Sequence, residues 1–107
     1  MSEAVRRRPP NRREHETLEF DHAGFHYVAG IGRFETGGLA EIFLNCAKSG
    51  TTIESHARDA AIVASIALQH GATAETIRHA ITRNRDGTAS GALGVLLDRL
   101  AIEDGET

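Results

Sequence analysis

The residues of this chain best suited to chemistry are a single cysteine and six histidines. Because Cys46 has no second cysteine to pair with, an internal disulfide or a dithiol reaction is excluded. No local Cys–His signature of a nucleophile surrounds it. We therefore expect Cys46 to be a half-buried structural thiol, and we expect no catalytic residue in the chain.

The histidines are candidate metal ligands, but their spacing is unfavourable. His22 and His26 straddle a tight turn, yet two ligands without a third do not make a closed zinc site. His56 and His70 fall at opposite ends of one expected helix, roughly 20 Å apart at the helical rise. The sequence contains no C-x-x-C pair. It therefore predicts no metal site and no bound cofactor.

A turn ahead of the longest expected helix is the best candidate for ligand binding. Free backbone N–H groups at a helix N-terminus attract anions. The turn is not the phosphate loop of nucleotide hydrolases, because its glycine follows the lysine. Two interpretations stay open, namely an anion site and a turn that only caps the helix. The candidate residues are Lys48, Ser49, Gly50, Thr51 and Thr52.

Charged side chains within and after this helix extend the candidate set. Asp59 lies in an otherwise apolar span, and a buried charge needs a partner. We expect it to pair with Arg78 or Arg99. The remaining candidate ligand-binding residues are Arg58, Arg83 and Arg85.

Hydrophobic periodicity predicts the elements that position these residues. Apolar residues alternate along 17–20, 25–32 and 40–45, and turn residues lie between these segments at 21–24 and 35–38. This pattern is typical of three consecutive antiparallel strands. Helical spacing then replaces the alternation for the rest of the chain. The predicted fold class is therefore α+β, with a three-stranded antiparallel sheet followed by three helices in two layers.

Capping residues predict where the helices begin and end. Thr51 or Thr52 caps the first helix, which ends at Gly71. Thr73 caps a short second helix, and Ser90 caps a third after a loop at 82–89. The first helix is apolar over much of its circumference. We expect it to be central, with the sheet on one side and helices or a partner chain on the other.

Charge divides the chain into a basic arm and an acidic body. Residues 1–15 hold five arginines and two glutamates, whereas the whole chain has a net charge of −3. The sequence predicts a disordered basic arm at 1–15, one domain at 16–103 and a frayed tail at 104–107. Such an arm could contact phosphates or the acidic face of a second copy. An acidic body disfavours binding to duplex nucleic acid.

No apolar run is long enough for a membrane span, and the single cysteine favours a cytoplasmic setting.

Several short motifs of the chain match those of a known family. They are Glu41-Ile42-Phe43, Lys48-Ser49-Gly50, Ser65 with Leu68 and Gly71, and Gly91-Ala92-Leu93-Gly94 before Leu97-Asp98. With these motifs the chain resembles the TSCPD domain, a small module found at the C-terminal end of adenosylcobalamin-dependent ribonucleotide reductases and in free-standing proteins. The resemblance covers roughly residues 17–102. The T-S-C-P-D string and the cysteines of the family are absent, so the resemblance does not carry over a zinc or thiol-exchange role.

The resemblance implies a role in deoxynucleotide metabolism and DNA synthesis. With one cysteine the chain cannot run ribonucleotide reduction alone, so a non-catalytic accessory or nucleotide-binding module of a ribonucleoside-diphosphate reductase is expected. A second implied class is the phage protein of the Thoeris anti-defence type, an oligomer that sequesters cyclic nucleotide signals between subunits. Its pocket residues here would be Arg6, Arg7, Arg8, Arg12, Arg13, Phe25, Tyr27, Arg83 and Arg85. A third class is a structural homo-oligomer without a ligand. The partners expected are therefore a second copy bound through the Ala-rich helix or the sheet, a reductase, or a nucleotide.

Overall fold

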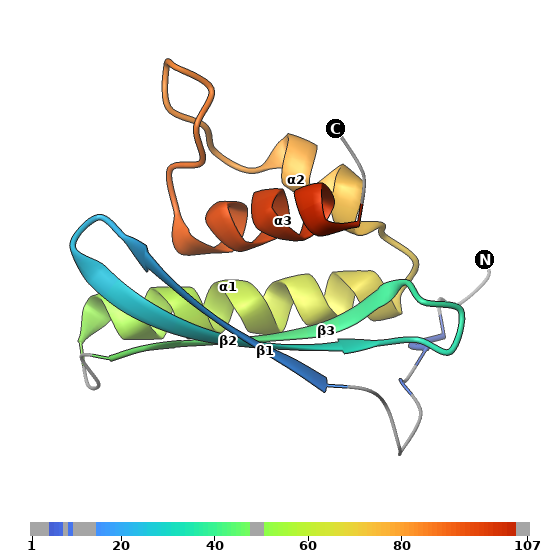
Figure 1. Ribbon diagram of the computed structural model, residues 1–107. Coiled ribbons are helices and arrows are strands. Elements are labelled where there is room, and N and C mark those ends of the chain that lie inside the picture. The colour runs from blue at the N-terminus through green and yellow to red at the C-terminus, as the bar shows by residue number, and fades with distance from the viewer. Residues whose placement is uncertain (1–4, 8, 10–14, 48–50, 105–107) are drawn as a thin grey trace.

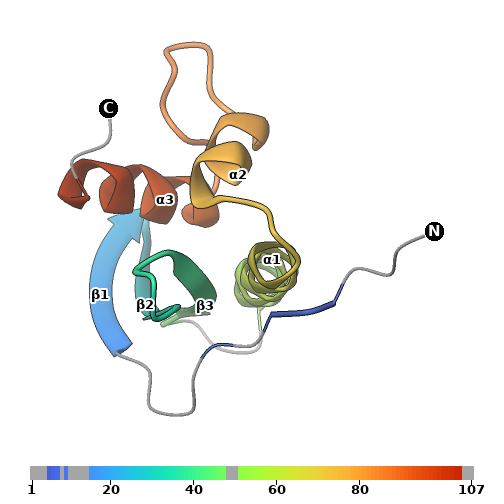
Figure 2. The same cartoon turned by 90° about the vertical axis from the view of Figure 1, so that its right-hand side faces the viewer.

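The structure is a computed structural model that describes residues 5–7, 9, 15–47 and 51–104. Three strands are followed by three helices (Figure 1). The strands are β1 (His15–His22), β2 (Phe25–Arg33) and β3 (Leu39–Cys46), and the helices are α1 (Thr52–Gln69), α2 (Ala74–Ala80) and α3 (Ala92–Glu103). The predicted α+β fold is confirmed. Figure 2 shows the helices gathered on one side of a curved sheet.

The sheet is an antiparallel meander with β2 at its centre. The β1–β2 hairpin turns at Ala23 and Gly24, whose φ angles of 51° and 85° are both positive, as a two-residue type I′ turn requires. Side chains alternate between the two faces of each strand. On β2 this alternation directs Tyr27, Ala29 and Ile31 into the core. Leu44, Leu96 and Leu97 are the other almost fully buried large side chains.

Gly32 is required by a close approach within the sheet. A Cβ atom at this position would lie 2.6 Å from Oε1 of Glu41, the residue opposite on β3. The register of β2 and β3 also shifts between Gly32 and Arg33. Glycine within a strand often marks a bulge, and the irregularity of this strand lies beside Gly32.

Helix α1 closes the β3 edge of the sheet. The backbone N–H of Ile42 donates to Oγ of Ser65 at 2.8 Å, and the Ser65 hydroxyl lies 3.1 Å from the Ile42 carbonyl. The Gln69 amide donates to the Ala40 carbonyl at 3.0 Å. A strand edge normally leaves such groups unpaired. Here one face of α1 satisfies them, and Ala57, Ala61, Ala64 and Leu68 are buried on the same side of the helix.

The opposite face of α1 is not covered by helices of the described chain, so of the two covers expected for it only a partner chain stays a prediction. Ile62, Val63 and Ile66 are 50%, 66% and 41% exposed, and no residue in the described part of the chain buries them. Asp59 is also exposed rather than buried with a partner. The predicted pairing of Asp59 is wrong, because Arg78 pairs with Asp98 and Arg99 pairs with Glu103.

The last third of the chain packs α3 on the core and α2 on α3 (Figure 1). Thr73 caps α2 as predicted, its side chain accepting from the Thr76 N–H at 3.0 Å. Ser90 does not cap α3, because Gly91 occupies the N-cap position and makes no side-chain bond. The Ser90 hydroxyl instead donates to Asn84 in the preceding loop, at 2.9 Å. No helix among the described residues has the length and hydropathy of a membrane span.

Candidate functional site

The predicted anion site at the start of α1 is only partly within the described residues. Lys48, Ser49 and Gly50 lie outside them. Thr51 is the N-cap, and its hydroxyl accepts from the Glu54 N–H at 3.2 Å. Thr52 opens the helix and is exposed. The hydrogen bond from Glu54 identifies Thr51 as the helix cap.

Arg58 lies one turn further along α1. It is 54% exposed and pairs with the carboxylate of Glu54 at 3.4 Å. An exposed pair of this kind at i, i+4 is a common helix-stabilising contact. Arg58 therefore has a partner within its own helix.

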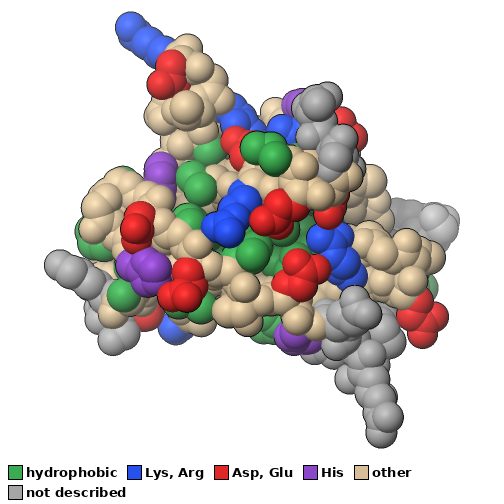
Figure 3. Space-filling view, in the orientation of Figure 1, with side chains coloured by type: hydrophobic (Ala, Val, Ile, Leu, Met, Phe, Trp, Pro, Cys, Tyr) green, Lys and Arg blue, Asp and Glu red, His purple; other side chains and the backbone are tan. Residues whose placement is uncertain are grey.

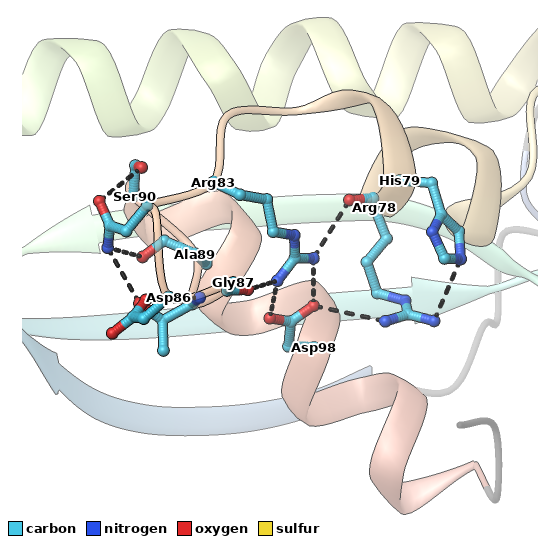
Figure 4. A network of polar contacts seen from close by, with 10 residues as sticks. Arg78, His79, Arg83, Asp86, Gly87, Ala89, Ser90 and Asp98 are labelled. Atoms are coloured by element: carbon cyan, nitrogen blue, oxygen red, sulfur yellow. Dashed lines mark hydrogen bonds and ion pairs between the residues drawn. The ribbon is translucent and has the colours of Figure 1, made fainter.

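Arg83 anchors a loop, and its predicted contact with a ligand stays a prediction. Its guanidinium donates to both carboxylate oxygens of Asp98 on α3, at 2.5 and 2.6 Å (Figure 4). These hydrogen bonds hold the pKa of Asp98 below its ordinary value. A bidentate pair of this kind fixes geometry as well as adding energy. Arg85, at the exposed end of the same loop, makes no such contact.

The loop between α2 and α3 is organised by its own polar side chains. The Thr88 hydroxyl and N–H both donate to Asp86, which lowers the pKa of that carboxyl. Asn84 donates to Thr88 and accepts from Ser90. The loop projects away from the body, with a basic side chain at its tip (Figure 3). None of the described residues of the predicted ligand-binding set lines either of the two cavities of the structure.

A groove of about 620 Å³, which we call the C-terminal groove, lies at the other end of α1. Six parts of the chain meet there: the N-terminal arm, the β2–β3 turn, the end of α1, the α1–α2 connection, α2 and the end of α3. Its volume lies within the range of small-molecule sites. The floor is apolar and the rim is charged. The lining residues used below are Arg7, Arg33, Phe34, Gln69, Arg78 and Asp104.

Arg33 uses its donors to hold the groove together. It donates to Glu16 at 3.3 Å, to the Gly37 carbonyl at 3.0 Å and to Asp104 at 3.3 Å. These bonds join β1, the β2–β3 turn and the end of α3. Arg33 is therefore a structural clamp of the groove wall.

Arg7 brings the basic arm to the same groove. Its backbone N–H donates to the Gln69 carbonyl at 2.5 Å, and its guanidinium lies 4.0 Å from the centre of the Phe34 ring. Arg6 donates to the Gln69 side chain at 2.6 Å. No acidic side chain among the described residues pairs with Arg7. This part of the arm packs on the body, and the division into arm, domain and tail otherwise stays a prediction.

Arg78 supplies a second positively charged side chain to the groove, and one of its N–H donors has no partner among the described residues. Its side chain is 13% exposed, and it reaches Asp98 at 3.6 Å and His79 at 3.4 Å. Its Nε is buried and has no hydrogen-bond partner in the described part of the chain. Leaving a buried donor unpaired is costly. Because the Nε is buried, a ligand in the groove would contact the terminal nitrogens of the Arg78 guanidinium.

The other residues considered in the sequence analysis are buried or bonded within the protein. Cys46 is buried with 4% exposure, more deeply than the half-buried thiol expected. His22 contacts the Ser90 carbonyl at 3.0 Å, whereas His26 bridges two carboxylates on the outer face of the sheet, so these two histidines do not converge. No group of three metal-ligating side chains occurs within residues 15–47 and 51–104. Tyr27 is buried and stacked on Phe20, which leaves it no free face for a ligand.

The resemblance motif around the end of α1 proves to be a packing motif. Ser65 and Gln69 bond the edge of β3, Leu68 is in the core, and Gly71 has a φ of 108° beside the groove. The sequence analysis missed Phe34, Arg33 and Arg78 as groove residues. The basic arm was the one signal that pointed to this end of the molecule.

Comparisons with known proteins leave the family open. A scan against protein-family models finds no match, and neither the curated proteins nor the solved structures contain a significant match. The TSCPD resemblance therefore stays a prediction that rests on the motifs quoted above.

Proposed function

We propose that this chain is a non-catalytic module that binds a nucleotide-like anion in the C-terminal groove. The observation that carries the proposal is Arg7, whose guanidinium lies over the Phe34 ring at the groove without an acidic partner among the described residues. A guanidinium with free donors binds phosphate, and its planar face stacks on aromatic groups such as a base. A nucleotide combines both groups in one molecule.

The charge of the groove supports an anionic ligand of modest size. The lining of the groove contains three arginines, Arg7, Arg33 and Arg78, and two acidic residues, Glu75 and Asp104. Arg33 is already bound to Asp104. Two arginines therefore have capacity left for a ligand. The apolar floor suits the uncharged part of such a molecule.

The resemblance offers two biological settings for such a site. An accessory module of a ribonucleotide reductase would bind a ribonucleotide or a deoxynucleotide. A protein that sequesters cyclic nucleotide signals would bind a cyclic nucleotide. The same ligand panel separates these settings.

The test is isothermal calorimetry of the whole chain with deoxynucleoside triphosphates, ribonucleotides, cyclic nucleotides and inorganic phosphate. Arg7→Gln and Phe34→Leu are expected to weaken binding about tenfold or more, because the first removes the guanidinium that contacts the ligand and the second removes the ring that holds this guanidinium in place. Arg58→Gln, at the opposite end of α1, is the matched control and leaves affinity unchanged.

Two results would contradict the proposal. If Arg58→Gln weakens binding and Arg7→Gln does not, the ligand binds at the N-terminal turn of α1. If no member of the panel binds, the groove is not a nucleotide site, and pull-down of a reductase becomes the next experiment.

A further inference from the structure

The outer face of α1 carries an apolar stripe that the monomer does not use. Ile62, Val63 and Ile66 are its exposed centre, and they lie on the side of the helix opposite the residues buried against β3. In Figure 2, α1 lies at the flank of the molecule, and no labelled element lies outside it. Three large aliphatic side chains gathered on one exposed helix face mark an interaction surface.

The ends of this stripe carry side chains of opposite character. Asp59 lies one turn before Ile62 and His70 lies one turn after Ile66, and both are exposed. Positions 59, 62, 63, 66 and 70 follow the i, i+3, i+4 spacing that keeps residues on one face of a helix. The stripe is about 16 Å long, because each helical residue rises about 1.5 Å.

This arrangement selects one orientation for a second copy. Two parallel α1 helices would place Asp59 beside Asp59 and His70 beside His70. Two antiparallel helices place each Asp59 beside the His70 of the other copy, with the aliphatic side chains between them. An antiparallel pair is related by a two-fold axis, so the contact closes on itself as a dimer.

We infer that the chain forms an antiparallel homodimer through the outer face of α1. Other surfaces fit a second copy less well. The outer side of β1 carries Glu19 and Asp21, which would face like charges in a two-fold strand pair. Phe43, on the outer face of the sheet, already stacks on His15.

The size of the stripe sets the strength of the dimer. A single helix face contributes a few hundred Å², well below the ~800 Å² per partner of a standard stable interface. The dimer is therefore reversible, with dissociation in the micromolar range or weaker. The terminal Asp59–His70 contacts fix orientation more than they add affinity, because exposed ion pairs stabilise little.

The experiment is sedimentation velocity of the whole chain from about 10 µM to about 1 mM, the range in which such an interface populates both species. The wild type is expected to shift from monomer to dimer. Val63→Glu is expected to remain monomeric throughout, because it places a charge in the centre of the stripe. Ile102→Glu, a matched change at a residue 76% exposed on α3, is expected to dimerise like the wild type. Circular dichroism checks that each variant is folded.

Charge reversal tests the orientation. Asp59→Lys alone and His70→Glu alone are each expected to weaken the dimer, and the double variant is expected to restore it. A parallel dimer would show no restoration and would overturn the antiparallel arrangement. A monomer at every concentration, or equal loss of association in Val63→Glu and Ile102→Glu, would overturn the interface itself.

Discussion

The two edges of the sheet are treated in opposite ways by this fold. The β3 edge is covered by α1, and its backbone groups bond to Ser65 and Gln69. The β1 edge has no neighbouring strand among the described residues, and Arg99 donates to one of its carbonyls, that of Glu19, at 2.9 Å. The covered edge depends on specific buried side chains. The open edge depends on exposed acidic residues, which discourage another strand from pairing there.

This difference teaches where substitutions should matter. A buried backbone group that loses its partner has no water to replace it, so the cost of the loss is large. An exposed group that loses its partner is rehydrated. We therefore expect substitutions at the β3 edge to lower the free energy of unfolding much more than similar substitutions at the β1 edge.

The largest effect is expected at Ser65. Ser65→Ala removes the hydroxyl that accepts from the Ile42 N–H and that lies within hydrogen-bond distance of the carbonyls of Ala61 and Ile42, and Ser65 and Ile42 are both buried. We expect the free energy of unfolding to fall by about 2–4 kcal/mol, measured by urea denaturation. Ser55→Ala, on the exposed face of the same helix, is the control and should be neutral or slightly stabilising. Equal midpoints for the two variants would show that the β3 edge is not held by this serine.

A smaller loss is expected at Gln69. Gln69→Leu keeps the bulk of the side chain but removes its bonds to the Ala40 carbonyl and to Arg6. Stability should fall by about 1–3 kcal/mol in the same assay. The freed arm should also be cut faster by trypsin after Arg6 and Arg7. Unchanged cleavage would contradict the tethering of the arm by this residue.

The open edge should respond weakly. Arg99→Gln removes the bond to the Glu19 carbonyl from a side chain that is 43% exposed. We expect a change within about 0.5 kcal/mol, as for most surface substitutions. A loss as large as that of Ser65→Ala would mean that the β1 edge also depends on a specific contact, and the contrast between the edges would fail.

The smallest effect is a pH dependence at the β1–β2 hairpin. Hydrogen bonds from His26 to Glu19 and Asp21 raise the pKa of His26 above its ordinary 6.5. The folded state therefore binds this proton more tightly than the unfolded state does. The resulting stabilisation is present below pH 6.5 and is lost as the pH rises through the raised pKa. Proton NMR titration should place the His26 pKa above 6.5, and His26→Gln should flatten the melting temperature across this range.

The fold could be predicted from the sequence because its signals are local. The alternation of apolar and polar residues predicted the three strands. The caps Thr51 and Thr73 accept hydrogen bonds from N–H groups three residues away. The wrong assignments also have a local origin. Serine is a common N-cap residue, but the hydroxyl of Ser90 donates to Asn84 in the preceding loop instead.

The candidate site could not be predicted in the same way. Arg7, Phe34 and Arg78 come from the arm, the β2–β3 turn and α2, and no spacing rule connects them. Their convergence depends on how α1 lies along β3, which Ser65 and Gln69 determine. The motif that suggested a family therefore positions the groove without forming its charged rim.

One side chain described above also has a consequence for the order of folding. Gln69 uses its amide nitrogen for β3 and its amide oxygen for Arg6, a residue 63 positions away in sequence. The oxygen is presented to the arm only after α1 has docked on β3. The arm is therefore expected to dock in a late kinetic step, after the core has formed. A fluorescent probe on the arm would report the arrival of the finished native state, while a probe in the sheet would report the collapse that precedes it.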